Sequence, residues 1–495
     1  MSVTDRVSAL FKGPEELELT SGSIAKPLLY LSLPIVITNL FQTAYNIADT
    51  FWLGQYSTDA LAAITFAFPM VFLLIALALG ISVAGSVLVA QYVGADEEER
   101  AEYAASQTVA FAAVAAVVLG AIGFVFVDEF LVLLGASADV TPLATSYMQV
   151  YSVGLVAVFG FAVFVSLMRG YGDTVTPMLV MFGSVVLNIL LDPLLIFGFD
   201  QNPLFGYLGL RGLESQLFAL TGYTGSGIEG AAIATVFSRL LALVVGLVIM
   251  FQGTRGVRIR LSQMKPDADY ARRLLDIGVP ASIEGTARAL SVNLLLVVVA
   301  LFPDTVAAAY GIGTRVFSVI FLPAIAFSQG VETMTGQNIG AGKLDRAEYA
   351  NHYGAKVMLG ALTAFGAVVF LAAHPIAAVF TQNPEVAAIG AEFLRYAALT
   401  FGFIGVMRSY SGGFRGAGQT LIAAVISIAM LGFIRLPIAW VGAHRLGVEG
   451  LWIAFAVSNV LGGVISYVWF ERGTWRDADV TEARGPSAAP DATDD

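Results

Sequence analysis

Twelve long apolar segments follow one another along the chain, and they restrict its fold more than any other feature. At a rise of 1.5 Å per residue, a helix needs about 20 residues to cross a hydrocarbon core about 30 Å thick. Only 13% of the residues are charged, against about 25% in a typical soluble domain. We therefore predict an all-α polytopic membrane protein with 12 transmembrane helices, at residues 27–53, 61–90, 101–127, 143–168, 174–198, 228–252, 271–301, 305–336, 347–371, 387–411, 418–442 and 447–470.

The two halves of the chain repeat one another at a constant spacing of 246 residues. QYVGA at 91–95 returns as QNIGA at 337–341, and RGYGDT at 169–174 returns as RGAGQT at 415–420. Because six helices separate the copies, both halves have the same topology, which predicts two pseudo-symmetric six-helix lobes related by an axis along the membrane normal. The first half also carries an additional outer loop at 200–227.

Charge in the loops predicts the orientation. Lys and Arg gather in the amino-terminal segment, in the loops after even-numbered helices and in the tail, so both termini of a multi-pass plasma-membrane protein are expected in the cytoplasm. We predict a monomer in a lipid bilayer that handles small molecules and binds no nucleic acid. The predicted divisions are a cytoplasmic segment (1–26), an N-lobe (27–252), a cytoplasmic linker (253–270), a C-lobe (271–471) and a disordered acidic cytoplasmic tail (472–495).

The first apolar segment carries a polar stripe that ends in an acid. Asn39, Gln42, Asn46 and Asp49 share one helical face. An ionised carboxylate facing lipid costs about 3 kcal/mol or more, so the stripe is expected to face a hydrated interior. We predict that Tyr45 and the three amides line a substrate cavity. The alternative is that Asp49 lies at the aqueous end of the helix and caps it.

Acids in the membrane segments belong mainly to the first half. Asn188 and Asp192 lie four residues apart, and their counterparts in the second half are aliphatic; Thr235 likewise has an aromatic counterpart. Two carboxylates in a low-dielectric pocket either share a proton or close on a cation. We predict that Asp49, Asn188, Asp192 and Thr235 form a coupling-ion site for H+ or Na+. The alternative is a structural hydrogen-bond network that joins helices 1 and 5.

Pro34 interrupts the hydrogen-bond ladder of helix 1, which predicts a hinge between straight and bent forms that ion binding biases. In the second half, Glu284 and Arg288 are spaced for an ion pair. The other arginines in or near the spans could snorkel, pair locally or bind an anionic substrate. They are Arg315, Arg395, Arg408 and Arg435.

Residue types needed for catalysis are scarce. The chain has no cysteine and three scattered histidines, and we find neither a Ser-His-Asp arrangement nor a nucleotide-binding motif. We therefore expect no enzymatic activity, and no cofactor apart from H+ or Na+ as the coupling ion.

Taken together, the motifs resemble the multidrug and toxic compound extrusion (MATE) family, and most closely its archaeal DinF-like branch. The similarity extends over about 24–470. It rests on Pro34 with the polar stripe after it, Gln91-x-x-Gly94-Ala95, Arg169-Gly-x-Gly172-Asp and Asn188-x-x-x-Asp192-Pro193.

The resemblance implies two lobes that alternate access and export organic, often cationic, compounds in exchange for H+ or Na+. It also implies that Asp49, Asn188, Asp192 and Thr235 form the ion site, with Tyr147 of helix 4 beside it. A lipid-linked oligosaccharide flippase of the same superfamily is the alternative. A basic central cavity would favour that flippase, whereas an acidic or aromatic cavity would favour cationic drugs.

Overall fold

The structure is a computed structural model that describes residues 18–135 and 137–477 of the 495-residue chain. The amino-terminal residues 1–17 and most of the predicted tail, 478–495, lie outside the described residues. Within the described ranges the regular elements are helices, without strands.

Ten helices of the described chain are long and apolar enough to span a membrane, and two bent helix pairs each supply one more span. The prediction of twelve spans is therefore confirmed. The first half contains α2 (Ala25–Tyr56), α3 (Thr58–Gly94), α4 (Glu98–Val125), α5 (Val127–Leu133), α6 (Thr141–Val153), α7 (Leu155–Tyr171), α8 (Val175–Phe197), α9 (Pro203–Tyr207), α10 (Arg211–Thr221) and α11 (Gly227–Gln252). After η2 (Leu261–Gln263), the second half contains α12 (Ala268–Val299), α13 (Asp304–Gly340), α14 (Leu344–Leu371), α15 (Ala373–Phe380), α16 (Pro384–Ala398), α17 (Phe401–Gly416), α18 (Thr420–Ile428), η3 (Ala429–Arg435), α19 (Leu436–Leu446), α20 (Val448–Glu471) and η4 (Thr474–Asp477).

Spans 4 and 10 are bent, although the sequence predicts a single segment for each. The angle is 54° between α6 and α7 and 50° between α16 and α17. The breaks lie at Gly154, which packs closely on Val236, and at Thr400, whose hydroxyl donates to the carbonyl of Ala397 at 2.8 Å. Positions 154 and 400 are 246 residues apart. The bends therefore follow the internal repeat.

Two further features depart from the predicted segments. The outer loop at 200–227 contains the short helices α9 and α10. Span 11 consists of α18, a π-helical stretch η3 and α19, and it continues to Leu446 rather than ending near 442. Only the second half has a π-helical stretch among the described residues, so the repeat is broken there.

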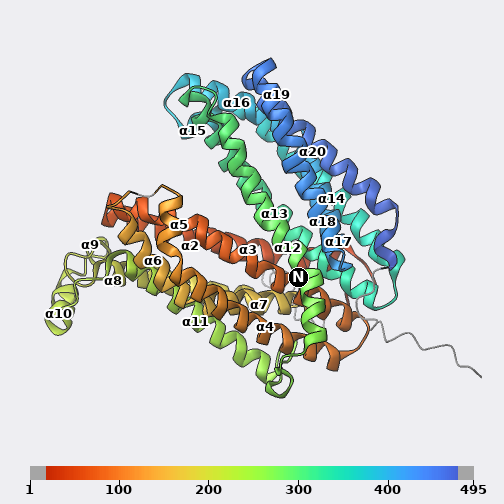
Figure 1. Ribbon diagram of the computed structural model, residues 1–495, viewed down its shortest axis with the longest axis horizontal. Helices are drawn as coiled ribbons and strands as arrows, with labels where there is room; N and C mark the ends of the chain where they lie inside the picture. Colours follow the sequence, from red (N-terminus) through yellow and green to blue (C-terminus); the bar gives the residue numbers. More distant parts are fainter. Residues whose placement is uncertain (1–17, 136, 478–495) are drawn as a thin grey trace, which may run out of the picture.

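Helices α2–α11 form one bundle and α12–α20 a second bundle (Figure 1). The bundles meet at one end and diverge towards the other, where α5, α9 and α10 lie far from α15, α16 and α19. The helices that cross the junction are long: α12 packs on α3, and α13 packs on α2 and α3.

The repeated Gln-x-x-Gly motifs form the junction. A Cβ atom on Gly94 would lie 1.9 Å from the carbonyl oxygen of Gln337, and one on Gly340 would lie 1.9 Å from that of Gln91. Only glycine allows helices α3 and α13 to approach this closely. Each motif therefore provides the contact surface for its own repeat.

The glutamine side chains of these motifs reach across the junction in the same reciprocal way. Gln91 Nε2 donates to the carbonyl of Gly416 at 2.9 Å, and Gln337 Nε2 donates to that of Gly170 at 3.1 Å. These acceptors lie in the repeated Arg-Gly-x-Gly turns. Each bundle thus donates a glutamine hydrogen bond to the Arg-Gly-x-Gly turn of the other bundle.

Candidate cation and substrate sites

Helix α2 runs without a break through Pro34. The proline leaves the carbonyl of Tyr30 without its helical donor, and the hydroxyl of Thr174 lies 3.4 Å from that oxygen as a donor. In the second bundle Thr420, the repeat of Thr174, donates to the carbonyl of Ile277 at 2.6 Å beside the equivalent proline. Each repeated turn therefore donates a threonine hydroxyl to the proline-containing helix of its own bundle, and the hinge at Pro34 stays a prediction.

Two acids from different helices meet inside the first bundle. Asp49 of α2 is 5% exposed and Asp192 of α8 is fully buried, and their carboxyl groups lie within hydrogen-bonding reach of each other. Asn188 Nδ2 donates to Asp192 Oδ1 at 2.9 Å. Thr235 Oγ1 lies 3.5 Å from Asp49 Oδ2. The structure thus brings all four residues of the predicted ion site together.

Three buried oxygens of this group have no hydrogen-bond donor among the described residues: Asp49 Oδ1, Asn188 Oδ1 and Asp192 Oδ2. A buried acceptor without a partner costs about 1–3 kcal/mol, and more when the group is charged. Two adjacent carboxylates would also repel each other unless a proton or a cation lies between them. Hard oxygen ligands of this kind suit Na+ as well as H+.

Tyr147 lies beside the acid pair, as the family resemblance implies. It is buried on α6, its ring stacks on Tyr151 with centroids 6.2 Å apart, and its electrostatic neighbours include Asp49 and Tyr45. Tyr45 is itself 3% exposed. The structure packs Tyr45 inside the bundle next to the acids, and its place in a substrate cavity stays a prediction.

The polar stripe of α2 is divided between two environments. At 100° per residue it spans about 80°, with Gln42 and Asp49 on one edge and Asn39 and Asn46 on the other. Gln42 turns into the bundle, while Asn46 is exposed and Asn39 is half-buried. Gln42 Nε2 donates to Asn46 Oδ1 at 3.1 Å. The cavity role of the amides stays a prediction.

Arg239 of α11 was not predicted, yet it lies one turn beyond Thr235 in the same bundle. Its guanidinium donates to Gln42 Oε1 at 2.6 Å and lies 4.7 Å from the ring centroid of Tyr45. Arg239 is 6% exposed and has no ion pair with any described carboxylate. A buried arginine within an apolar span is rare, and that rarity alone could have marked it.

A chain of buried charges joins the bundles near their junction. Glu332 of α13 lies between Arg415 of α17, at 3.1 Å, and Arg169 of α7, at 3.9 Å. Arg415 also pairs with Glu284 at 3.3 Å, and Glu284 pairs with Arg288 at 2.7 Å. The predicted Glu284–Arg288 pair is therefore present, within a larger network that includes one contact between the bundles.

The remaining membrane arginines differ in their surroundings. Arg315 and Arg395 are exposed on α13 and α16. Arg408, only 5% exposed, and Arg435 line a cavity in the second bundle.

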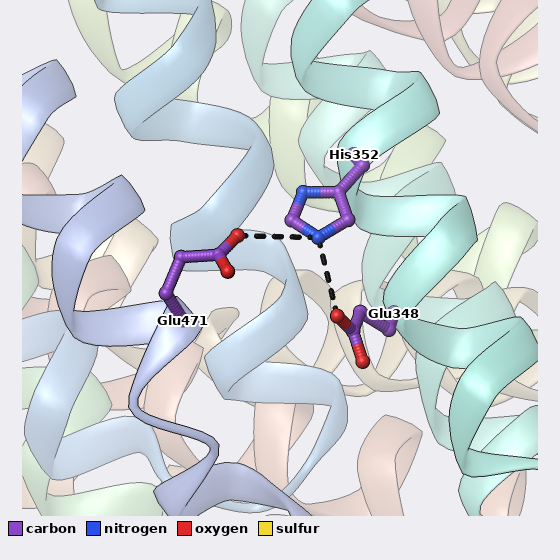
Figure 2. A group of neighbouring side chains, drawn as sticks. All are labelled: Glu348, His352 and Glu471. Carbon is purple, nitrogen blue, oxygen red and sulfur yellow. Dashed lines mark ion pairs between the residues drawn. The ribbon is translucent and has the colours of Figure 1, made fainter.

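One described group has a geometry suited to a metal ion: Glu348, His352 and Glu471. Figure 2 shows His352 between the two carboxylates, at 3.5 Å from Glu348 and 3.3 Å from Glu471. Other side chains already bind these groups, because the Tyr410 hydroxyl contacts His352 Nδ1 at 2.9 Å and Arg476 forms an ion pair with Glu348. We interpret these contacts as a tie between α14 and α20.

Comparison with known proteins identifies the fold and the family. The MatE family model matches residues 34–194 and 280–441. The chain is 28% identical over 457 residues to a protein of Shewanella oneidensis named "FAD transporter", covering 92% of this chain and 96% of that protein. It is also 28% identical over 469 residues to "Probable multidrug resistance protein YoeA" of Bacillus subtilis, covering 91% and 96%.

Among solved structures, the chain resembles one described as the "outward-facing conformation of a multidrug resistance MATE family transporter", with a TM-score of 0.81. The two share 23% identity, over 93% of this chain and 98% of the other. Twelve spans in two repeated bundles, the matched family model and the matched fold agree. The chain therefore belongs to the MatE family of multi-pass membrane transporters, the MATE family that its motifs resemble.

Proposed function

We propose that the protein is a secondary active exporter of small organic compounds in exchange for one monovalent cation, H+ or Na+. The observation that supports it best is the set of three buried acceptor oxygens around Asp49, Asn188 and Asp192. With both acids ionised, they and Arg239 carry a net charge of −1. One proton or one Na+ brings the buried cluster to neutrality, whereas a second would leave it positive.

The arrangement of the bundles supports alternating access. They are joined where the Gln-x-x-Gly motifs meet and diverge at the other end (Figure 1). If both termini are cytoplasmic, as the loop charges predict, this form opens away from the cytoplasm. Helix α2 carries both Pro34 and Asp49, so bending at Pro34 would move one acid relative to Asp192. That motion would couple ion binding to the change of access.

The substrate class has two candidates. Several relatives are named multidrug resistance or multidrug export proteins, which favours organic, often cationic, drugs. The second candidate is an anionic substrate, because arginines line the cavity of the second bundle and one relative is named a FAD transporter. The lipid-linked oligosaccharide flippase falls in this second class, but the cavity is aromatic as well as basic, and this favours a soluble aromatic compound over it.

The other proposals follow from the family and the charges. We place the protein in the plasma membrane as a monomer, without a cofactor apart from the coupling ion and without nucleic-acid partners. The archaeal DinF-like branch stays a prediction, since the sequence relatives reported above come from bacteria.

The test is gradient-driven uptake into proteoliposomes with an imposed pH or sodium gradient, measured with ethidium for the cationic class and with flavin mononucleotide for the anionic class. We expect one of the gradients to drive accumulation, and Asp49→Asn and Asp192→Asn each to abolish it. Asp128→Asn, at an exposed acid of the same bundle, is the matched control and should transport normally. Gradient-driven transport that survives in both site variants would refute the proposed coupling site.

A further inference from the structure

A cavity of about 430 Å³ lies inside the second bundle, away from the acid pair. Its walls come from α12, α13, α17, α18, the π-helical η3 and α20. Most of the lining is aromatic or aliphatic, but Arg288, Arg408 and Arg435 also face it. Binding sites for organic molecules are typically 300–1,000 Å³, apolar, with a few placed polar groups.

The arginines of this cavity are short of partners. Glu284 neutralises Arg288, but Arg408 has no hydrogen bond or ion pair from its side chain within the described chain. The Nε atoms of Arg288 and Arg408 are both buried, and neither has an acceptor in the part of the chain that the structure describes. The guanidinium of Arg408 is 5% exposed and lies 5.4 Å from the ring centroid of Phe321, which offers no hydrogen-bond acceptor. Burying its donors without an acceptor is costly in an apolar setting. An anion in the cavity would supply the missing acceptors.

Arg435 completes the basic wall. It ends the π-helical stretch, donates to Ser458 and Asn459 at 2.8 Å each, and lies 4.4 Å from the ring centroid of Phe455. These neutral partners fix its position and leave its charge uncompensated. π-Helical turns occur frequently at functional sites. The first-half counterparts of Arg408 and Arg435 are Ala162 and Ile189, so this basic wall belongs to one bundle, as the acid pair belongs to the other.

Aromatic rings line the same cavity beside the arginines. Phe317, Phe321 and Phe455 line the cavity. Phe317 lies against Phe393 with ring centroids 5.7 Å apart, and Phe393 stacks on Trp452 at 4.3 Å. This packing holds the lining rings in place, which favours stacking on a rigid planar ligand.

We infer that the cavity binds an organic anion that joins a planar ring system to a phosphate group. Arg408 and Arg435 bring two charges without carboxylate partners, which match a phosphate monoester of charge near −2. The volume suits a mononucleotide-sized molecule. This inference rests on the proposed function, since it names the class of compound that the exporter carries.

The test measures binding to the purified full-length protein in nanodiscs of neutral lipid, without any ion gradient. Flavin mononucleotide is the probe, and riboflavin is the same ring system without phosphate. We expect flavin mononucleotide to bind at least tenfold more tightly, a difference of about 1.4 kcal/mol. Equal affinities, or no binding, would overturn the inference.

Variants locate the site. Arg408→Gln and Arg435→Gln should each weaken binding of flavin mononucleotide at least tenfold while changing riboflavin affinity less than threefold. Riboflavin binding thus reports that each variant is folded, and Arg408→Lys should retain most of the affinity. Arg395→Gln, at an exposed arginine of the same bundle, should bind as the native chain does. Unchanged binding in both glutamine variants of the cavity contradicts the assignment.

A lipid headgroup offers the same phosphate chemistry, so the nanodiscs are also prepared with phosphatidylglycerol. Displacement of flavin mononucleotide by that lipid would assign the cavity to lipid and overturn the inference; unchanged affinity supports it. Binding in the nanodiscs is measured without an ion gradient, whereas the coupling site is tested only by transport that a gradient drives. Failure of the coupling site therefore shows only in gradient-driven transport, and failure of the cavity assignment shows only in binding.

Discussion

Replacing Glu332 by Gln should shift the protein away from the form in which the two bundles are joined at the Gln-x-x-Gly motifs. Glu332 is 3% exposed, and its carboxylate lies 3.9 Å from Arg169 of the other bundle. Glutamine keeps the size of the side chain but removes the charge. Arg415 keeps its second partner, Glu284, at 3.3 Å, so the change acts mainly on the contact between the bundles.

Coulomb's law sets the magnitude. Two unit charges 3.9 Å apart attract by about 4 kcal/mol at an effective dielectric constant near 20, and by about 1 kcal/mol in water. When the junction opens, water replaces the protein around both groups, so the pair favours the joined form by an amount between these limits. Glu332→Gln should therefore shift the equilibrium by about 1–4 kcal/mol, a factor of about 5 to 1,000.

The assay uses the absence of cysteine in the chain. Leu133→Cys and Val379→Cys place spin labels on two exposed positions, one at the outer end of each bundle, that are related by the 246-residue repeat. Double electron–electron resonance should show a long distance between the two labels in the native chain, and an additional population at shorter distance in Glu332→Gln. Glu97→Gln, at an exposed ion pair with Arg100, should change nothing. An identical distance distribution in Glu332→Gln and the native chain refutes the reasoning.

Three smaller perturbations test other parts of the structure. Thr174→Val removes the hydroxyl that faces the freed carbonyl of Tyr30 and should lower stability by about 1 kcal/mol, seen as a lower thermal midpoint; an unchanged midpoint argues against that support. Gly94→Ala places a methyl 1.9 Å from a carbonyl of α13, so the same spin-label pair should report a loss of the joined form; native distances would contradict the close approach. The hydrogen bond from Tyr103 lowers the pKa of Asp267 at the start of α12, so its stabilisation is present above the unfolded pKa of about 3.9 and is lost as pH falls through the lower folded pKa. As the pH is lowered, the thermal midpoint of Asp267→Asn should therefore fall less than that of the native chain. An equal fall in both contradicts the assignment.

The ion-site residues were predictable because polar side chains are costly in apolar spans. Asp49 and Asp192 stand out from their helices, and the repeat shows that their counterparts are not acidic. Their contact across α2 and α8 follows from packing, which the sequence does not contain. Arg239 has a polar counterpart, Asn459, in the second half, so the difference between the halves that marks the acids does not mark this arginine.

The twelve spans were predictable from hydropathy, but their interruptions were not. Gly154 and Thr400 bend spans 4 and 10 through a close helix contact and a local hydroxyl bond, and both residues are common in unbent membrane helices. The π-helical turn that ends at Arg435 lies in an ordinary apolar stretch. Since that turn helps to shape the cavity, the basic pocket required the structure.

The central claim is that the Asp49–Asp192 pair takes up one cation per chain. Scintillation proximity measures bound 22Na+ on the purified protein, and an indicator dye measures protons released or taken up over the same titration. We expect the sum of bound Na+ and exchangeable protons at the site to be one per chain, and the double variant Asp49→Asn/Asp192→Asn to lose it. A double variant that binds the same number of cations as the native chain would contradict the account.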